Sequence, residues 1–394
     1  MLNLKLLIKE FLCSLRIFRE YTSKFEITKI TDSSGHIFFG YYDKFPLNWN
    51  QNILLAHRYK GDVSLDNSLP VEIGFYDFAN KKFIKKCSSL AWSWQLGSRL
   101  MWINDNEFIY NDFSSEKKRY VSRVFSLEED TLVKEYDFPI FDISKNCKLI
   151  ASTSFFEIRK YRPGYGYQHY EKDSVKSIEV REFDSEKIIK IITKSDLASF
   201  LPSKKLNLIK GSFFNHLRFS PNGKRLYFVY CHALDNKHKI EQPFVYDFNN
   251  DKLELVTKNS ITHEEWISDD ELLLYSSCEG EGFKYCIFDI PNLNQKIVKT
   301  LSSLPDGHPT YDKGNIICDS YPNRFGYQAI YFSEDFNKQR LVKIASFHSP
   351  IKYRGEIRCD LHPRLENNVC IVDLIDGDTK KRAMGLINLN HAKR

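Results

Sequence analysis

Four histidines occupy the same place in a repeated sequence pattern, which makes them the first candidates for chemistry. They are His216, His263, His308 and His362, and each lies five or six residues before a polar turn. Imidazoles that converge from neighbouring strands can bind a divalent cation or transfer a proton, especially beside carboxylates such as Asp360. The alternative is that each histidine only anchors its own strand through hydrogen bonds.

Three arginines lie close to these segments and are candidates for binding a carboxylate. Arg358 and Arg364 flank the sequence DLHP, and Arg99 follows the Trp-rich sequence AWSWQLGS. A guanidinium group recognises a carboxylate through paired hydrogen bonds, so an acidic substrate is a natural ligand for such a residue.

Aromatic and polar residues complete the candidate binding set. His36, Trp94 and Gln95 stand in the corresponding segments of earlier repeats. The sequence RPGYGY at residues 162–167, which includes Tyr165, predicts either a lid that stacks on a sugar or a surface loop packed by its own aromatic rings.

The elements that must position these residues follow from a sevenfold repeat. A polar turn with Asn, Asp or Gly precedes a short apolar strand at 48–58, 103–112, 143–153, 220–230, 268–277, 312–321 and 366–374. A second strand follows each copy, and the copies recur at intervals of roughly 40 to 50 residues, the period of a four-stranded propeller blade. The strand before each turn is expected to be the innermost strand of its blade.

The predicted fold class is therefore all-β, a seven-bladed β-propeller with a short N-terminal amphipathic helix. The helix is expected at residues 1–22 and the propeller at 23–394, with an insertion at about 155–210. The strand at 25–32 is expected to complete the last blade and so remove a free sheet edge. Two stacked β-sandwich domains are the competing architecture, in which the sevenfold count would be an accident.

Composition narrows the partners and the location. The 57 basic and 51 acidic residues give a net charge of +6 without a dense basic block, so no nucleic-acid partner is predicted, and an anionic glycan is compatible. Nine cysteines without a CxxC pair predict reduced thiols in the cytoplasm. Residues 1–22 predict a helix that packs on the domain or on a partner, or that lies peripherally on the inner face of a membrane.

Several sequence stretches resemble a known family. GHIFFGYYDKFP, AWSWQLGSRLMW, RPGYGY, NHLRFSPNGKR, THEEW, DGHPTY, DSYP and RCDLHPR run from residue 35 to 364. The chain is similar to the oligogalacturonate lyase-like seven-bladed propellers, and more closely to relatives linked to bacterial surface-polysaccharide gene clusters. The similarity to the lyases themselves is strongest at THEEW, DGHP and DLHP.

The resemblance implies a metal site and a reaction. In the lyases, three His and one Gln hold a manganese-type ion that neutralises a uronate carboxylate. A base then removes the proton α to that carboxylate, and the glycosidic oxygen leaves by β-elimination. His308 and His362 match two of the ligands, and Asp360 stands where the lyases carry another His. His263 matches a lyase His near the substrate, and His216 matches another inner-strand position.

The chain departs from the lyase pattern at two further positions. Ile357 and Arg358 occupy the stretch where the Gln ligand is expected. Gln242 and Pro243 stand near the place of the catalytic Arg, and no Arg is present there.

Three functions remain open from the sequence. The first is a carbohydrate-active enzyme that acts on an anionic, uronate-type glycan or oligosaccharide by metal-assisted β-elimination. It would use a divalent metal such as Mn²⁺ at His308, His362 and Asp360, with His263 or His216 as the catalytic base. Its substrate-binding residues would be Arg358, Arg364, Arg99, Trp94, Tyr165 and His36. The second is polysaccharide biosynthesis by sugar transfer at the cytoplasmic face, and the third is a non-catalytic glycan-binding or scaffold propeller.

Overall fold

The structure is a computed structural model. It describes residues 23–65, 69–168, 175–200, 211–233, 239–336 and 341–392. The amphipathic helix predicted over residues 1–22 lies outside these described residues. No helix in the described ranges is long and apolar enough to cross a membrane.

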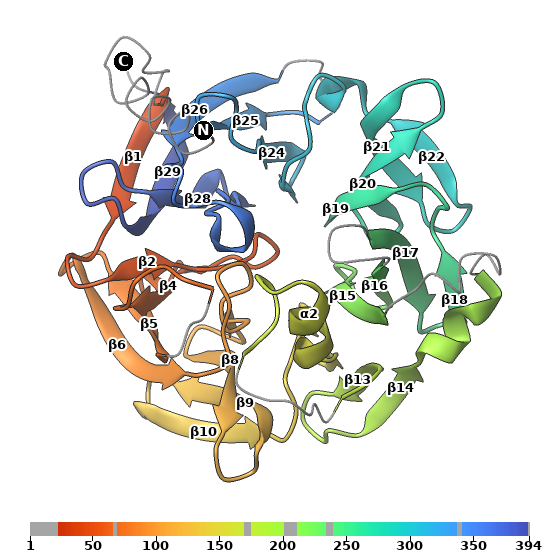
Figure 1. The fold of residues 1–394 in the computed structure, drawn as a ribbon, viewed down its shortest axis with the longest axis horizontal. Coiled ribbons are helices and arrows are strands. Elements are labelled where there is room, and N and C mark those ends of the chain that lie inside the picture. The colour runs from red at the N-terminus through yellow and green to blue at the C-terminus, as the bar shows by residue number, and fades with distance from the viewer. Residues whose placement is uncertain are drawn as a thin grey trace, which may run out of the picture. The chain divides into compact units, whose positions relative to one another are not determined.

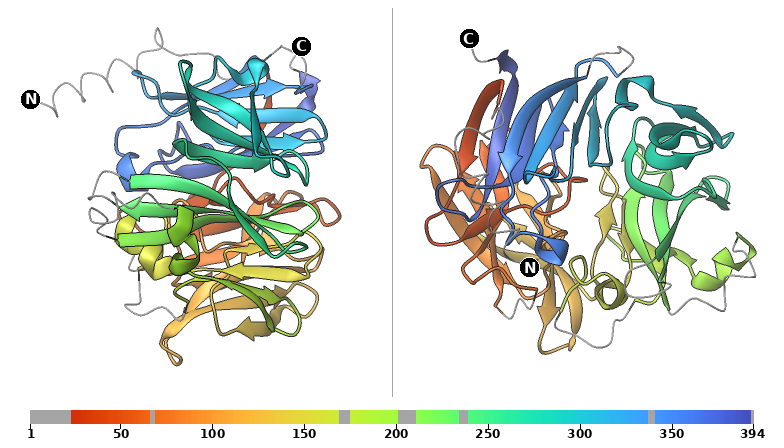
Figure 2. Two further views of the ribbon diagram at one scale, coloured as in Figure 1. Left: turned by 90° about the vertical axis from the view of Figure 1, so that its right-hand side faces the viewer. Right: turned by 45° about the horizontal axis from the view of Figure 1, so that its top comes forward.

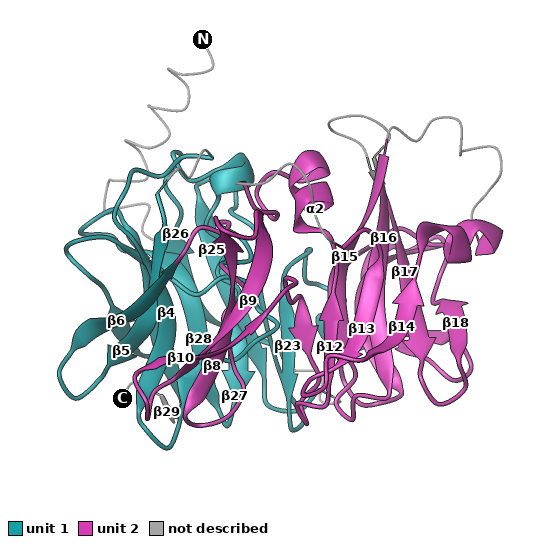
Figure 3. Cartoon of the chain, turned by 90° about the horizontal axis from the view of Figure 1, so that it is seen from below, with its two compact units in different colours: residues 1–88, 94–97, 299–394 teal, residues 89–93, 98–298 magenta. Residues whose placement is uncertain are grey.

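Among the described residues, regular structure consists almost entirely of short antiparallel strands, which are grouped into two compact units (Figure 3). Unit 1 comprises residues 1–88, 94–97 and 299–394, and unit 2 comprises residues 89–93 and 98–298.

Unit 1 contains three sheets, in each of which the strands pair in the order named. The first is β2 (His36–Phe38), β4 (Ile53–Tyr59), β5 (Val71–Asp77) and β6 (Lys82–Ser89), with β3 (Leu47–Asn48) also paired to β4. The second is β23 (Pro309–Asp312), β24 (Asn315–Asp319), β25 (Tyr327–Ser333) and β26 (Val342–His348). The third is β27 (Arg364–Glu366), β28 (Val369–Ile375), β29 (Arg382–Ala392) and β1 (Phe25–Ile30).

Unit 2 contains four sheets of the same plan. They are β7 (Met101–Trp102) to β10 (Thr131–Tyr136) through β8 (Glu107–Ser114) and β9 (Arg119–Ser126), and β11 (Asp142–Ile143) to β14 (Ile188–Ile192) through β12 (Leu149–Ser152) and β13 (Ile178–Glu182). The others are β15 (Gly211–Phe219) to β18 (Lys252–Leu255) through β16 (Arg225–Ala233) and β17 (Lys239–Asp247), and β19 (Ile261–Trp266) to β22 (Asn294–Ile297) through β20 (Glu271–Cys278) and β21 (Gly282–Asp289).

Within the described residues, helical structure is confined to connections between strands. Helix α2 (Phe155–Tyr161) lies between β12 and β13, within the predicted insertion. Short 3₁₀ turns are η2 (Lys194–Phe200), η4 (Lys299–Leu301) and η5 (Gly355–Ile357). The Ser154 side chain caps α2 by accepting a hydrogen bond from the backbone N–H of Glu157 at 3.0 Å.

The burial of the strands explains why each sheet forms. The middle strands are buried on both faces, as β4 and β28 show, whereas the outer strands β10, β14 and β22 are largely exposed. Neighbouring sheets share apolar layers, such as the cluster of Ile317, Ile330, Leu361, Val372 and Ile387 in unit 1. This burial provides the main driving force for the fold.

The described residues thus contain the seven sheets that the repeat predicts, and the strands of each sheet lie side by side in antiparallel order (Figures 1 and 2). As predicted, β1 completes the last sheet by pairing with β29, with Ile30 opposite Met384. The protein is an all-β, seven-bladed β-propeller.

Candidate metal centre

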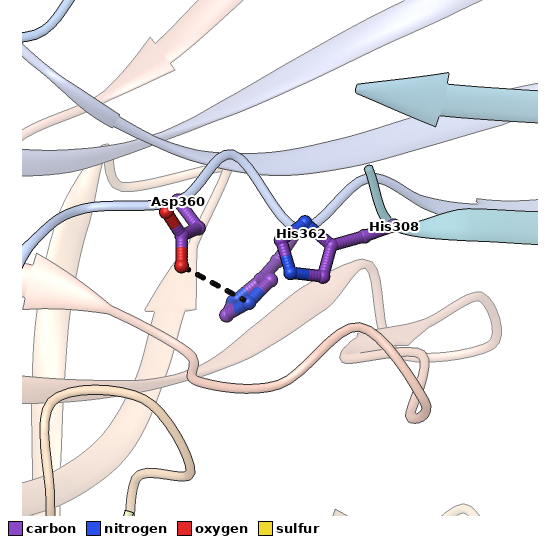
Figure 4. Close-up of side chains that lie close together, drawn as sticks. All are labelled: His308, Asp360 and His362. Carbon is purple, nitrogen blue, oxygen red and sulfur yellow. Dashed lines mark ion pairs between the residues drawn. The ribbon is translucent and has the colours of Figure 1, made fainter. Parts of the chain in front are cut away.

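Three buried side chains of unit 1 form a cluster of possible metal ligands. The ligand atoms of His308, Asp360 and His362 all lie within 4.8 Å of one another. Figure 4 shows the three side chains turned toward one another, and His362 Nε2 lies 4.0 Å from Asp360 Oδ2. The two imidazole rings meet edge to face, with their centroids 4.4 Å apart.

Local sequence explains how these side chains reach one place. Leu361 is fully buried in the apolar layer of unit 1, so the segment before β27 is anchored between its two ligand residues, Asp360 and His362. His308 directly precedes β23, where Gly307 passes against the backbone of Asp319. A Cβ at Gly307 would collide with the Asp319 carbonyl group, so only glycine permits this close approach.

A carboxylate fixes the orientation and the tautomer of His308. The Nδ1 atom of His308 lies 2.9 and 3.0 Å from the two carboxylate oxygens of Asp319, and the His308 backbone N–H donates to the same side chain at 2.7 Å. Because Nδ1 donates to Asp319, Nε2 is the ring nitrogen that can coordinate a metal. Burial acts to lower the pKa of His308, but the Asp319 carboxylate outweighs it and raises the pKa.

A backbone carbonyl does the same for His362. The Nδ1 atom of His362 donates to the carbonyl oxygen of Gly40 at 2.6 Å, and its backbone N–H donates to Asp319 at 3.1 Å. Burial, followed by the charges of His308 and Arg364, lowers the pKa of His362 well below its usual value. The ring is therefore neutral, and its buried Nε2 has no hydrogen-bond partner among the described residues.

Asp360 combines one paired oxygen with one unpaired oxygen. Its Oδ2 accepts a hydrogen bond from Arg358 Nε at 2.7 Å, whereas its buried Oδ1 has no hydrogen-bond partner among the described residues. Arg358 keeps part of its side chain exposed, so it provides a positive charge at the edge of the cluster.

Tyrosines surround the cluster. The ring of Tyr42 lies 5.2 Å from that of His308, and the ring of Tyr41 lies 5.1 Å from that of His362. Tyr321, which is only partly buried, meets His308 edge to face at 5.7 Å.

The residues present fit a divalent transition metal. Two ligands of one ion can be no more than about 4.4 Å apart at ordinary bond lengths, so the cluster is close to ligating geometry. Two imidazoles and one carboxylate suit Mn²⁺, Fe²⁺ or Zn²⁺, and three protein ligands leave positions for a substrate. The unpaired buried atoms of His362 and Asp360 support this fit, because such atoms are costly unless a partner satisfies them.

Strand register corrects the positions assigned to the early repeats. Each predicted histidine stands three residues before an apolar residue that pairs with the next strand, for example His308 before Tyr311 and His362 before Leu365. The matching residues in the first two sheets are Lys44, before Leu47, and Arg99, before Trp102. This position is not occupied by His36, Trp94 or Gln95. The short strand β2 and the loop before β7 add residues that the sequence repeat does not show, so these three residues stand earlier in the chain than the matching positions.

His216 and His263 lie in unit 2, on β15 and β19, and each occupies a β-bulge. The register skips from Asn215 to Arg218 in β15 and from Thr262 to Glu264 in β19. Both histidines are buried and have positive φ angles, 53° and 21°. Positive φ is uncommon for residues other than glycine and often marks functional positions.

Two of the predicted carboxylate-binding arginines are buried in structural contacts. Arg364 donates to the carbonyl oxygens of Gly40 and Tyr41 and pairs with Asp373 at 3.0 Å. Arg99 donates to the carbonyl oxygen of Phe141 at 2.7 Å and stacks on its ring. Their contacts support neighbouring segments, and of the three arginines Arg358 is the one that donates a hydrogen bond to a candidate ligand, Asp360.

The remaining candidates are also buried. Trp94 donates to Ser64 at 2.7 Å and lies under the guanidinium of Arg382. His36 lies beside Trp94, and burial together with the charge of Arg382 lowers its pKa to about 4. Tyr165 is fully buried beneath Arg162, so the 162–167 loop is packed by its own side chains, and the predicted stacking face on Tyr165 is covered.

Sequence reasoning missed the residues that hold the ligands in place. Asp319 orients both histidines, and Gly40 supplies the carbonyl oxygen for His362. Asp373 accepts from the backbone N–H of Gly40 at 3.2 Å and thereby fixes that carbonyl. The sequences DSYP and FFGYYD contain Asp319 and Gly40, but nothing local in them predicts a contact with a histidine far along the chain.

Comparisons with known proteins identify the fold and leave the chemistry open. No protein-family model matches the sequence, and no curated protein matches it. An oligogalacturonate lyase in complex with manganese is similar in structure, with a TM-score of 0.63, 12% identity, and 94% of this chain and 95% of that chain covered. An oligogalacturonate lyase from Vibrio parahaemolyticus has a TM-score of 0.60 and 10% identity, with 94% and 96% covered.

A tricorn protease is also similar, with a TM-score of 0.52, 11% identity, and 96% of this chain and 36% of that chain covered. A lyase and a protease therefore both contain this fold, so the fold does not decide which reaction a protein catalyses. The resemblance predicted from the sequence is confirmed at the level of architecture: the chain has the β-propeller fold of the oligogalacturonate lyases.

Proposed function

We propose that this protein acts on an anionic, uronate-type glycan or oligosaccharide by metal-assisted β-elimination. The observation that carries the proposal is the buried trio of His308, His362 and Asp360, in which the hydrogen bonds of Nδ1 make Nε2 the atom by which each ring would hold a metal. The shared fold of a manganese-bound oligogalacturonate lyase supports the same assignment.

The proposed reaction needs a cation that neutralises the substrate carboxylate and a base that removes the adjacent proton. When bound at this trio, a divalent ion such as Mn²⁺ supplies positive charge that neutralises a uronate carboxylate and acidifies the adjacent C–H. Arg358, held by Asp360, adds a second positive charge for the same carboxylate. The base takes the α proton, and the electron pair of the broken C–H bond forms a carbon–carbon double bond. The bond from the β carbon to the glycosidic oxygen breaks, and this oxygen takes up a proton from solvent water.

The base in this proposal is His263. His216 is the less suitable of the two predicted bases, because Arg162 Nη1 lies 3.3 Å from its Nε2 and Glu264 Oε1 lies 3.2 Å from its Nδ1. Arginine only donates hydrogen bonds, so the Nε2 lone pair of His216 is already engaged. Its conversion to a base would require Arg162 to move.

The decisive experiment is an assay for the unsaturated uronate product. Anionic oligosaccharides, beginning with oligogalacturonates, are incubated with the purified chain with and without Mn²⁺, and the absorbance of the new double bond is followed. We expect metal-dependent product formation that the double replacement His308→Ala and His362→Ala abolishes together with bound metal. His348→Ala, a substitution in β26 outside the trio, is the matched control and should retain both.

The same assay separates the alternatives. His263→Gln should lower turnover while leaving the metal content unchanged. Metal-dependent glycan binding without product would favour a non-catalytic glycan-binding propeller, and product formation in chelator at the full rate would contradict the proposal. A cytoplasmic location and a peripheral membrane contact through residues 1–22 are also proposed, and cell fractionation of a tagged chain tests both.

A further inference from the structure

Two neighbouring sheets of unit 2 direct polar side chains toward one another through their bulges. A bulge places an extra residue in one strand and changes the direction of nearby side chains. The bulges of β15 and β19 fall at His216 and His263, and the ring of His216 reaches across to Glu264 on β19. Arg218, the first paired residue after the bulge of β15, also binds β19 by pairing with Glu265 at 2.7 Å.

Helix α2 places a cation at the same point. Arg162 directly follows α2, and its guanidinium carbon lies 3.6 Å from the centroid of the Tyr165 ring. Its Nη1 lies 3.3 Å from His216 Nε2 and 3.7 Å from Glu241 Oε1. The side chains of Arg162 and Glu241 are partly exposed, so the cluster has an edge open to solvent.

Behind this edge lie buried polar atoms without partners. Both atoms of the Asn215 side-chain amide, and the hydroxyl of Tyr227, are buried and have no hydrogen-bond partner among the described residues. Asn215 lies opposite Val229 in the strand pair, and Tyr227 is two residues from Val229, so the two side chains share one face of the sheet. Glu241 lies opposite Cys231 and therefore belongs to this face as well.

The carboxylates of the cluster affect the protonation of the buried Tyr227 phenol. Burial, and next the charges of Glu264 and Glu241, raise the pKa of Tyr227 well above its usual value. The phenol therefore stays protonated and can donate a hydrogen bond. The amide of Asn215 can donate and accept, whereas the carboxylates accept and the guanidinium donates.

This mixture of groups selects one class of ligand. Three carboxylates, Glu241, Glu264 and Glu265, oppose a second anionic group, and two arginines oppose a metal ion. Neutral hydroxyl groups, which both donate and accept, match the set. We propose that Asn215, Tyr227 and Glu264 form a polyol-binding subsite in unit 2 that takes the vicinal hydroxyls of a neutral pyranose.

The choice of a sugar rests on the proposed function, whereas the presence of a hydroxyl-binding subsite rests on the contacts within unit 2. The simpler alternative is that ordered water fills the same hydrogen bonds. An experiment on metal-free protein separates this subsite from the metal centre of unit 1.

The test is a titration of the chelator-treated full chain with the methyl pyranosides of glucose, galactose and mannose, and with sodium galacturonate. The ¹⁵N resonances of the His216 ring report on the subsite, because its two nitrogens contact Glu264 and Arg162. We expect at least one neutral glycoside to shift these resonances saturably, and galacturonate to bind no tighter than its neutral counterpart.

Replacement of Asn215 distinguishes a binding role from a structural one. Asn215→Leu should weaken glycoside binding by about tenfold or more, yet leave thermal stability unchanged or raised, because it removes an unpaired buried amide. Asn249→Leu, in the exposed turn after β17, should keep both properties. Asn111→Leu is the structural contrast, because the buried Asn111 amide is fully bonded to Ile140, Ser122 and Tyr167 and its loss should lower stability.

The outcomes are distinct. The subsite is refuted if no neutral glycoside shifts His216, which would leave ordered water as its content, or if Asn215→Leu binds as tightly as the unmodified chain. Loss of lyase activity or of metal in other variants would not affect this titration, so failure of the proposed function would be seen separately.

Discussion

At the scale of single residues, the hydrogen-bond acceptors of the two Nδ1 atoms decide what His308 and His362 can bind. An imidazole presents a lone pair at Nε2 only when Nδ1 carries the proton, and Asp319 and the Gly40 carbonyl enforce that arrangement on His308 and His362. Asp319 has the wider role, because it also accepts from the backbone N–H groups of both histidines.

Asp319→Asn should therefore weaken metal binding by about 10- to 100-fold while leaving the ligands in place. An amide cannot accept at both of its terminal atoms, so the backbone N–H of either His308 or His362 loses its acceptor, and the segment that carries that histidine is held less firmly. Calorimetric titration with Mn²⁺ measures the effect. Asp312→Asn, at the end of β23, is the control, and equal Mn²⁺ affinity in the two variants would refute the positioning role of Asp319.

At the scale of elements, close backbone approach sets the position of the trio. The segment before β23 passes against the end of β24, and the segment before β27 is held by Thr310, whose hydroxyl donates to the Pro363 carbonyl at 2.6 Å. The backbone N–H of Asp373 on β28 donates to the carbonyl oxygen of Leu361 at 2.8 Å. The segments that precede two short strands thus carry the ligands, and contacts with neighbouring strands hold these segments in place.

Gly307→Ala should displace His308 and lower both Mn²⁺ affinity and thermal stability, because the new Cβ would collide with the Asp319 carbonyl group. Gly377→Ala provides a matched control, since no heavy atom lies within 4 Å of a Cβ at that position. Calorimetry and thermal denaturation of the two variants measure the difference. Wild-type affinity and stability in Gly307→Ala would show that the strand end tolerates a shift.

At the scale of the whole molecule, buried neutral histidines couple stability to pH. Burial, with the charge of Arg382, lowers the pKa of His36 to about 4, and burial lowers that of His57 to about 3. Below about pH 6.5 the unfolded chain binds protons at these residues, whereas the folded chain does not. His308, whose pKa is raised, acts in the opposite direction, because its stabilising contribution is lost as the pH rises through its folded pKa.

The free energy of unfolding should therefore decrease as the pH falls from about 6.5 toward 4, by up to about 1.4 kcal/mol per pH unit for each lowered histidine. His57→Phe should reduce this slope by about the contribution of one histidine, because phenylalanine has no group to titrate. The new ring can take the place of the His57 ring, which stacks on Phe38. Urea denaturation of metal-free protein between pH 7 and 5 measures both slopes. An identical slope in the variant would exclude His57 as a source of the acid sensitivity.

The sequence by itself determined the seven blades and supplied the imidazole and carboxylate side chains of the candidate metal centre. Turn residues and alternating apolar residues act over short distances, so the seven strand pairs and the closing strand β1 were predictable from them. The choice of His308, Asp360 and His362 as one set of metal ligands came instead from the resemblance to the lyases. The strand register was harder to predict from the sequence. The short strand β2 and a loop before β7 shift the count, so the positions that correspond to the histidines in the first two sheets are Lys44 and Arg99.

Only the tertiary structure decided how these side chains are held. His362 and Gly40 are 322 residues apart, and no local pattern predicts that the ring of one binds the carbonyl oxygen of the other. The same holds for Arg364, which the sequence suggested for substrate and which folding buries against Gly40, Tyr41 and Asp373. The physical reason is that strand formation depends on neighbours along the chain, whereas tautomers, ion pairs and burial depend on which sheets pack together.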